Sequence, residues 1–251
     1  MSQSKLKISI VNYFNTLPFR YGIKHSELVS RMDLQEDIPS ICAQKLKFNQ
    51  VDIGLVPVAL LPELDNYKII TNYCIGANGK VDSVKLYSQV PLNEIKSVTL
   101  DYQSRSSIKL TKVLNKFYWK QNFEFKDAKP GYEQNITGTN AAVVIGDRTF
   151  ALNGTFKYEF DLAEEWKKMT GLPFVFAAWV TTSEINKDFV NEFDKVLENG
   201  INHISEAIKE SQITHPKNFD PSDYLSNKIS YKLDDKKKEA LQLFLKYMSQ
   251  L

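Results

Sequence analysis

Residues 5–18 read KLKISIVNYFNTLP, and this stretch decides the fold. Lys5–Val11 alternates polar with apolar residues, which predicts a β-strand. The strand ends abruptly in the polar residues 12–16. Pro18 suits the first turn of a helix, which we expect to continue to Lys24. A strand, a polar turn and a helix in succession form the unit from which α/β proteins are built.

The same alternation continues along the rest of the chain. The patterns predict strands at 51–56, 69–77, 81–88, 97–101, 141–145 and 174–180, and helices at 39–49, around 110–117, at 162–170, at 186–211 and from 234 onward. Asn78-Gly79 is expected to turn the chain between two of these strands as a hairpin does. Asp161 is expected to cap the helix that follows it. Strands alternating with helices indicate an α/β protein with a largely parallel sheet.

Composition narrows the class of protein. The 251 residues include 32 Lys and Arg against 30 Asp and Glu, so the formal net charge is +2. This near-neutral balance argues against a nucleic-acid partner. The longest proline-free apolar run, Phe174–Val180, is too short to span a bilayer, which argues against a membrane partner. Lys7 interrupts the apolar start of the chain, so no signal peptide is expected and the predicted location is cytoplasmic.

Several kinds of chemistry have no sequence support. The patterns GxGxxG, GxxxxGK[ST] and GxSxG are absent, and Cys42 and Cys74 form no CxxC pair. We interpret both cysteines as small buried apolar residues. The three histidines, His25, His203 and His215, are not spaced with another ligand, so we expect no metal site and no histidine-driven triad. No cofactor is expected either.

Polar residues follow three of the predicted strands, at 12–16, 104–107 and 146–147. Ligands of open α/β sheets bind beyond the carboxyl ends of strands. Ser106 and Ser107 lie at a predicted helix N-terminus, where hydroxyls and free amides favour a carboxylate or phosphate. The alternative, favoured on local grounds alone, is that one of these serines only caps the helix.

The other strand-end residues have similar alternatives. Arg105 could add a charged hydrogen bond to a ligand or face solvent. Asp147 could orient a substrate hydroxyl or cap the next turn. Asn12 and Asn15 bracket a tight turn, and an Asx turn alone would explain one of the two asparagines. Two amides beside Thr16 are more polar than capping needs.

Six segments follow one another along the chain: VNYFNTLPF at 11–19, DIGLVP at 52–57, GKVDSVKLYS at 79–88, SRSS at 104–107, IGD at 145–147 and DLAEEWKKMTGLPFVFAAW at 161–179. In this order they resemble the chorismate dehydratases of the futalosine pathway of menaquinone biosynthesis. The family often has threonine where Ser106 stands, which keeps the hydroxyl. The sister family, the dihydroxynaphthoate synthases, opens instead with a Ser-Pro-Cys-Pro-Asn-Asp type of motif.

The resemblance implies a two-lobed fold like that of the type II periplasmic binding proteins, with the ligand in the cleft. Lobe 1 would comprise residues 1–89 and 176–251, and lobe 2 residues 90–175. The chain would cross between the lobes near Val90-Pro91 and near Pro173–Ala178.

The resemblance also implies chorismate, a dicarboxylate, as substrate, and loss of water to give 3-[(1-carboxyvinyl)oxy]benzoate. Catalytic roles would fall to Asn15, Ser83 and Asp147. Substrate binding would fall to Asn12, Thr16, Ser104, Arg105, Ser106, Ser107 and Gly146. The proton acceptor would be Asp147 or the substrate's own enolpyruvyl carboxylate.

Three other functions stay open at this point. They are a non-catalytic protein that binds small carboxylates, the sister synthase activity, and the effector domain of a transcription regulator, for which no helix-turn-helix segment is evident. The sequence makes no prediction of the oligomeric state.

Overall fold

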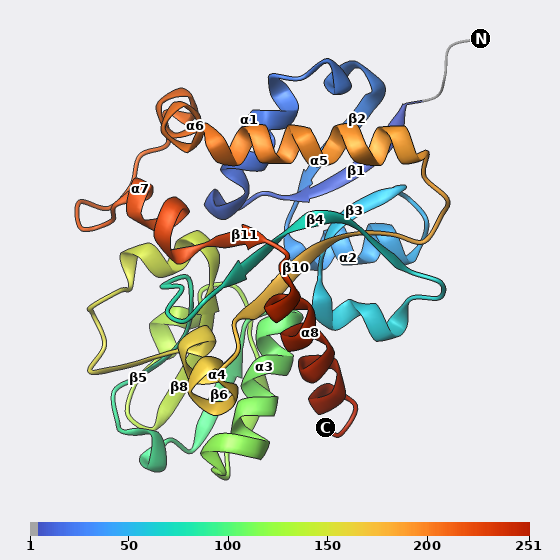
Figure 1. Cartoon of the computed structure of the whole chain (residues 1–251). Helices are drawn as coiled ribbons and strands as arrows, with labels where there is room; N and C mark the ends of the chain where they lie inside the picture. Colours follow the sequence, from blue (N-terminus) through green and yellow to red (C-terminus); the bar gives the residue numbers. More distant parts are fainter. Residues whose placement is uncertain (1–4) are drawn as a thin grey trace.

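A computed structural model describes residues 5–251 and contains two β-sheets with helices packed around them (Figure 1). The first sheet has the order β11-β4-β10-β3-β1-β2 and the second the order β7-β6-β8-β5-β9. The first sheet consists of β1 (Leu6–Val11), β2 (Met32–Asp37), β3 (Ile53–Pro57), β4 (Lys68–Ala77), β10 (Phe174–Thr181) and β11 (Ser230–Lys232). The second consists of β5 (Val84–Ser88), β6 (Ser97–Leu100), β7 (Glu124–Asp127), β8 (Asn140–Ile145) and β9 (Tyr158–Asp161).

The helices connect the strands and cover the sheets. The α-helices are α1 (Leu17–Lys24), α2 (Pro39–Lys47), α3 (Ser106–Leu114), α4 (Leu162–Thr170), α5 (Lys187–Asn202), α6 (Ile204–Ser211), α7 (Pro221–Asp223) and α8 (Asp235–Met248). Short 3₁₀ turns are η1 (Phe14–Thr16), η2 (Glu27–Arg31), η3 (Val58–Glu63), η4 (Leu92–Glu94), η6 (Tyr132–Asn135) and η7 (Gly146–Ala151), and single π turns are η5 (Asn115–Trp119) and η8 (Tyr224–Lys228). The predicted α/β fold class is confirmed.

Both sheets are mixed, so the prediction of a largely parallel sheet is wrong. β1 pairs in parallel with β2 and β3, and β6 with β7 and β8. β10, however, inserts antiparallel between β3 and β4, and β5 is antiparallel to β8 and β9. β10 follows the last strand of the second sheet in the chain and enters the middle of the first sheet. Every residue of β10 is buried, as its unbroken apolar run predicts.

The expected hairpin at Asn78-Gly79 is also wrong. The turn exists, with Gly79 at φ +109°, but β4 belongs to the first sheet and β5 to the second. Residues 78–83 therefore pass from one sheet to the other, before β5 and upstream of Val90-Pro91. Two apolar runs separated by a turn look alike in sequence whether the strands pair or part.

The long helix predicted at 186–211 is interrupted at His203, whose backbone (φ −121°, ψ 38°) separates α5 from α6. The sequence patterns also missed β2, β7, β9 and β11, all of which carry charged residues; β7, β9 and β11 are also short. Charges on an edge strand such as β2 suppress pairing with other chains, so they hide a real strand from a hydrophobicity pattern.

Other local predictions are confirmed. Asp161 caps α4 by accepting hydrogen bonds from the amides of Ala163 and Glu164, at 3.1 and 3.2 Å. Gly171 ends the same helix in a left-handed conformation at φ +76°. Cys42 and Cys74 are both buried as free thiols.

No helix within residues 5–251 has the length and apolar character needed to cross a membrane. Residues 1–4, part of the segment that argues against a signal peptide, lie outside the described residues.

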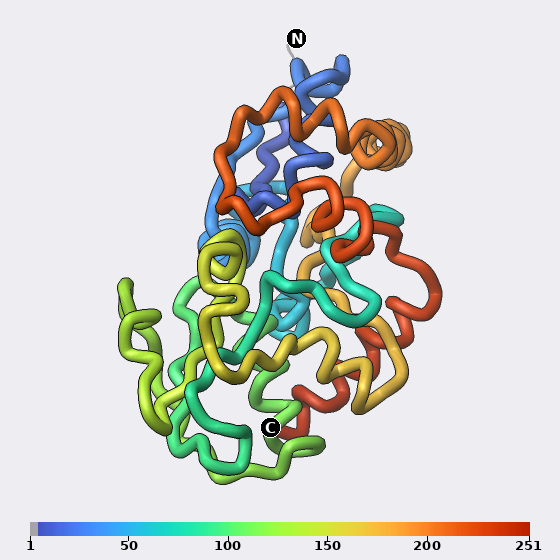
Figure 2. Tube along the Cα trace, turned by 90° about the vertical axis from the view of Figure 1, so that its left-hand side faces the viewer, coloured from blue at the N-terminus to red at the C-terminus, as the bar shows by residue number. Residues whose placement is uncertain are grey.

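The close packing of α1 against α5 fixes the position of the loop that follows β1. A Cβ built on Gly200 would lie 1.9 Å from the Pro18 carbonyl oxygen, and one on Gly22 would lie 2.2 Å from the Val196 carbonyl oxygen. Only glycine permits this approach of the two backbones. In Figure 2 the orange segment that follows α6 passes across the blue N-terminal segment. The Phe14 ring of the β1 loop contacts His215 and Phe219 of this segment, at centroid distances of 4.4 and 5.9 Å.

Candidate functional site

A cavity is lined by residues from both sheets. Six of the ten predicted site residues line the cavity: Asn15, Ser83, Ser104, Ser106, Ser107 and Gly146. They come from the loop after β1, the start of β5, the N-terminus of α3 and the end of β8. The remaining walls are largely apolar and include Val11, Ile75, Val84, Ile145 and Phe176.

Asn15 presents a side-chain oxygen without a partner. Its Oδ1 atom is buried and accepts no hydrogen bond from the protein within residues 5–251. The turn that carries Asn15 is held by the Thr16 hydroxyl, which lies 2.6 Å from the Val11 carbonyl oxygen and 2.8 Å from that of Tyr13. Tyr231 adds a hydrogen bond from its hydroxyl to the Asn15 carbonyl oxygen, at 3.0 Å. Thr16, a predicted substrate ligand, therefore lies behind the cavity wall and stabilises the turn.

Ser83 also lines the cavity and is buried. It follows Asp82, whose left-handed backbone (φ +63°) turns the chain into β5. The Ser83 Oγ atom accepts a hydrogen bond from the Tyr224 hydroxyl at 2.8 Å. The Ser83 carbonyl oxygen accepts from the amide of Gly146 at 2.9 Å, which ties two cavity residues together.

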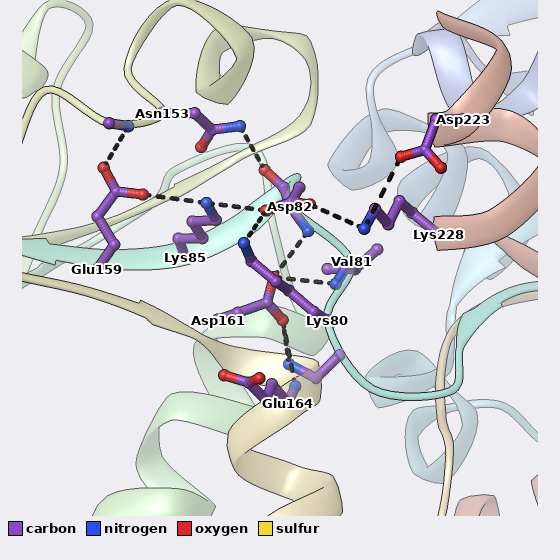
Figure 3. A network of polar contacts seen from close by, with 12 residues as sticks. Lys80, Val81, Asp82, Lys85, Asn153, Glu159, Asp161, Glu164, Asp223 and Lys228 are labelled. Atoms are coloured by element: carbon purple, nitrogen blue, oxygen red, sulfur yellow. Dashed lines mark hydrogen bonds and ion pairs between the residues drawn. The ribbon is translucent and has the colours of Figure 1, made fainter. Parts of the chain in front are cut away.

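A polar network fixes the segment that leads to Ser83 (Figure 3). The buried Asp161 carboxylate accepts from the amides of Val81 and Asp82, at 2.9 and 2.7 Å, as well as capping α4. The Asp82 carboxylate pairs with Lys85 at 3.0 Å, and Lys85 also bonds to Glu159 at 3.0 Å. The segment 78–83 is thus anchored to residues of β5 and β9 in the second sheet.

Of the three serines at the start of α3, Ser104 and Ser106 bond within the protein and Ser107 has its hydroxyl available to a ligand. Ser104 caps the helix by accepting from the Ser107 amide at 3.0 Å. The Ser106 hydroxyl donates to the Phe176 carbonyl oxygen at 2.8 Å and accepts from the Ala59 amide at 3.3 Å. Both capacities of the Ser106 hydroxyl are therefore used within the protein. Within residues 5–251 no protein group bonds to the Ser107 hydroxyl, which leaves it for a ligand.

Asp147 lies outside the cavity lining and joins the two sheets. Its carboxylate oxygens accept from the Phe14 amide at 3.0 and 3.1 Å, which caps the short helix that begins at Phe14. Desolvation raises the pKa of the Asp147 carboxyl, against the Phe14 hydrogen bond, which lowers it. The carboxylate thus holds the β1 loop against the loop after β8.

Two further predicted residues face away from the cavity lining. The exposed Asn12 accepts a hydrogen bond from Arg20 at 3.0 Å, and Arg105 pairs with Glu63 at 3.3 Å. The alternative in which Arg105 faces outward therefore describes its position.

Sequence reasoning missed three tyrosines of this site. The ring of Tyr13 covers Gly146 so closely that a Cβ there would lie 2.8 Å from it. Tyr13 also donates a hydrogen bond to Gln103. It sits within residues 5–18, so an aromatic residue in a strand-end loop was the available signal. Tyr224 and Tyr231 lie far from the cavity segments in sequence, and no local pattern could have placed them there.

Comparisons with known proteins identify a family and a related enzyme. The chain matches the family described as menaquinone biosynthesis over residues 6–250. The chorismate dehydratase of Campylobacter jejuni subsp. jejuni serotype O:23/36 (strain 81-176) is 26% identical over 244 residues, which covers 94% of each chain.

Solved structures establish the fold. A protein of Archaeoglobus fulgidus superimposes with a TM-score of 0.73 at 13% identity, covering 100% of this chain and 98% of the other. A Candida albicans protein described as having the generic periplasmic binding protein fold gives a TM-score of 0.61 at 11% identity, covering 99% and 94%. The predicted periplasmic-binding-protein-like fold is confirmed. Because the family match spans nearly all of its length, the chain belongs to the menaquinone biosynthesis family.

Proposed function

We propose that this protein is a chorismate dehydratase that converts chorismate to 3-[(1-carboxyvinyl)oxy]benzoate and water. The proposal includes a place in the futalosine pathway and a cytoplasmic location. It is supported by the family match, by the name of the Campylobacter jejuni relative, and by the polar groups gathered in one cavity.

The observation that carries the proposal is the unpartnered Oδ1 atom of Asn15 in the cavity wall, a statement that holds for residues 5–251. A buried acceptor left without a donor costs about 1–3 kcal/mol. A ligand hydroxyl in the cavity would satisfy this oxygen. The C4 hydroxyl of chorismate is such a donor, and Asn15 would hold it in place for departure.

The carboxylates of the substrate would be bound by dipoles. Within residues 5–251 the cavity lining contains no Lys, Arg, His, Asp or Glu. The N-terminus of α3 and the Ser107 hydroxyl supply hydrogen-bond donors for one carboxylate. Ser83 supplies a donor for the other. The apolar walls suit the ring.

The same lining bears on the proton acceptor. Asp147 is engaged with Phe14 and does not line the cavity. We therefore assign proton removal from C3 to the enolpyruvyl carboxylate of the substrate. The C3–H electron pair forms the new ring double bond as the C4–O bond breaks. The departing hydroxide takes the proton from the carboxylic acid, which yields water and restores the carboxylate.

Formation of an aromatic ring supplies a large driving force, so the protein needs chiefly to hold the reactive geometry. We also propose that the two sheets are the cores of two lobes, with the segments 78–83 and 171–173 as the crossings. Closing the lobes would exclude water from the cavity.

The test is incubation of purified protein with chorismate, with the products followed by NMR. The proposal requires the enolpyruvyl-oxybenzoate to form, and Asn15→Ala, shown to be folded by circular dichroism, to lose most of the rate. Chorismate that is bound but unchanged would favour a carboxylate-binding protein instead.

A further inference from the structure

We propose that Tyr224 is a positioning residue that fixes the Ser83 hydroxyl as a hydrogen-bond donor aimed into the cavity. The inference rests on the proposed function of the cavity and adds a residue that does not touch the substrate. Tyr224 comes from the C-terminal segment, 141 residues from Ser83 in sequence.

The Tyr224 ring is buried and packs among other aromatic rings. Its side chain is 3% exposed, in the short π turn η8. Its centroid lies 5.0 Å from the ring centroid of Phe150 and 5.4 Å from that of Phe219. It stacks on the Phe14 ring with 6.2 Å between the centroids. Because Phe14 directly precedes Asn15, the same aromatic cluster supports both polar walls of the cavity.

The direction of the Tyr224–Ser83 hydrogen bond follows from what surrounds each hydroxyl. Ser83 Oγ is the hydrogen-bond partner of the Tyr224 hydroxyl within residues 5–251, at 2.8 Å. If Ser83 donated, the buried hydrogen of Tyr224 would have no acceptor, at a cost of about 1–3 kcal/mol. Tyr224 therefore donates, and the hydrogen of Ser83 is free to point to a ligand oxygen in the cavity.

Two further features keep this arrangement intact. Burial raises the pKa of the Tyr224 phenol, so it remains protonated and remains a donor. Lys228, in the same π turn, lies 3.8 Å from the Asp82 carboxylate and 3.8 Å from that of Asp223 (Figure 3). The turn that carries Tyr224 thus also contacts the residue before Ser83.

The consequence is a division of roles. Ser83 would donate to a substrate carboxylate oxygen, and Tyr224 would orient and polarise that donor from behind. Hydrogen bonds in such a chain strengthen one another in a buried setting. Loss of the Tyr224 hydroxyl should slow turnover through Ser83 alone, while the binding contacts of the other walls stay in place.

The test is a double-mutant cycle on turnover of chorismate. Tyr224→Phe keeps the ring and removes one buried hydroxyl, and we expect kcat/KM to fall about tenfold. In a Ser83→Ala background the same change should alter kcat/KM by less than about twofold, since the group on which Tyr224 acts is gone. The double variant leaves neither hydroxyl unpartnered, so it stays measurable if Tyr224→Phe alone is unstable.

Tyr231→Phe is the matched control. Tyr231 is also buried and comes from the same segment, but its hydroxyl bonds to the Asn15 backbone carbonyl. Its effect should therefore be the same with and without Ser83. Equal effects of Tyr224→Phe in both backgrounds, or an unchanged kcat/KM in the single variant, would overturn the positioning role while leaving the dehydratase assignment standing. Wild-type protein that does not convert chorismate would overturn both.

Discussion

Replacing Gly146 with alanine should damage both stability and activity, for reasons that can be separated. Gly146 has φ +67°, a left-handed conformation that disfavours any side chain. A Cβ at this position would also lie 2.8, 2.9 and 3.0 Å from three ring carbons of Tyr13. Tyr13 is hydrogen-bonded to Gln103, so its ring cannot move aside without losing that contact.

The magnitude follows from these two effects. A left-handed alanine costs about 1–2 kcal/mol, and forcing an atom into a filled space costs typically about 1–3 kcal/mol. Together they predict a loss of about 2–5 kcal/mol in the free energy of unfolding. Gly154→Ala is the matched control, because Gly154 has φ +80° and a Cβ added there would meet no atom of residues 5–251 within 4 Å. It should lose only the conformational part.

The assay is urea unfolding of both variants beside the wild type, with chorismate turnover measured on the same preparations. Gly146→Ala should be less stable than Gly154→Ala by about 1–3 kcal/mol. It should also lose turnover, because displacing Tyr13 opens the wall of the cavity, whereas Gly154→Ala should keep it. Equal stability and equal activity in the two variants would refute the view that Tyr13 closes over Gly146.

Four more variants test other parts of the site and its support. Asp147→Asn keeps an acceptor for the Phe14 amide. In a turnover assay kcat should therefore fall far less than the roughly 100-fold expected for a lost general base. A loss of about 100-fold would show that Asp147 is the general base. Ser106→Ala should lower the free energy of unfolding, measured by denaturation, by about 1–3 kcal/mol. Ser107→Ala should leave stability unchanged and weaken chorismate binding, measured by calorimetry. The reverse pattern would contradict the assigned contacts. The Asp161 carboxylate accepts hydrogen bonds from four amides, and Asp161→Asn would leave two of them without an acceptor. The free energy of unfolding in urea should fall by about 3 kcal/mol. A loss below about 1 kcal/mol would show that the segment 78–83 is anchored elsewhere.

Local signals in the sequence predicted the parts of the fold that depend on neighbouring residues. The unbroken apolar runs at 141–145 and 174–180 became the buried strands β8 and β10, and the cap at Asp161 began α4 as expected. Pairing partners could not be predicted in this way. The sheet to which β5 belongs is decided by long-range contacts with β8 and β9, which leave no trace in the residues around Asn78-Gly79.

In the candidate site, too, the sequence predicted which segments come together but not the contacts of each side chain. The strand-end rule and the family resemblance located Asn15, Ser83 and Ser107, which line one cavity. They could not separate residues that face the ligand from residues that hold the loops. Thr16 and Ser106 have the same hydroxyl chemistry as their neighbours, and only the backbone carbonyls beside them show that their hydrogen bonds are already made.

The most direct test of the proposed site is a crystal structure of Asn15→Ala protein soaked with chorismate. We predict one substrate carboxylate within hydrogen-bond distance of the Ser107 hydroxyl at the start of α3, and a substrate oxygen within hydrogen-bond distance of Ser83. Chorismate bound elsewhere, for example in the surface groove lined by Arg20, Lys24 and Glu210, would contradict the assignment of the cavity as the site of dehydration.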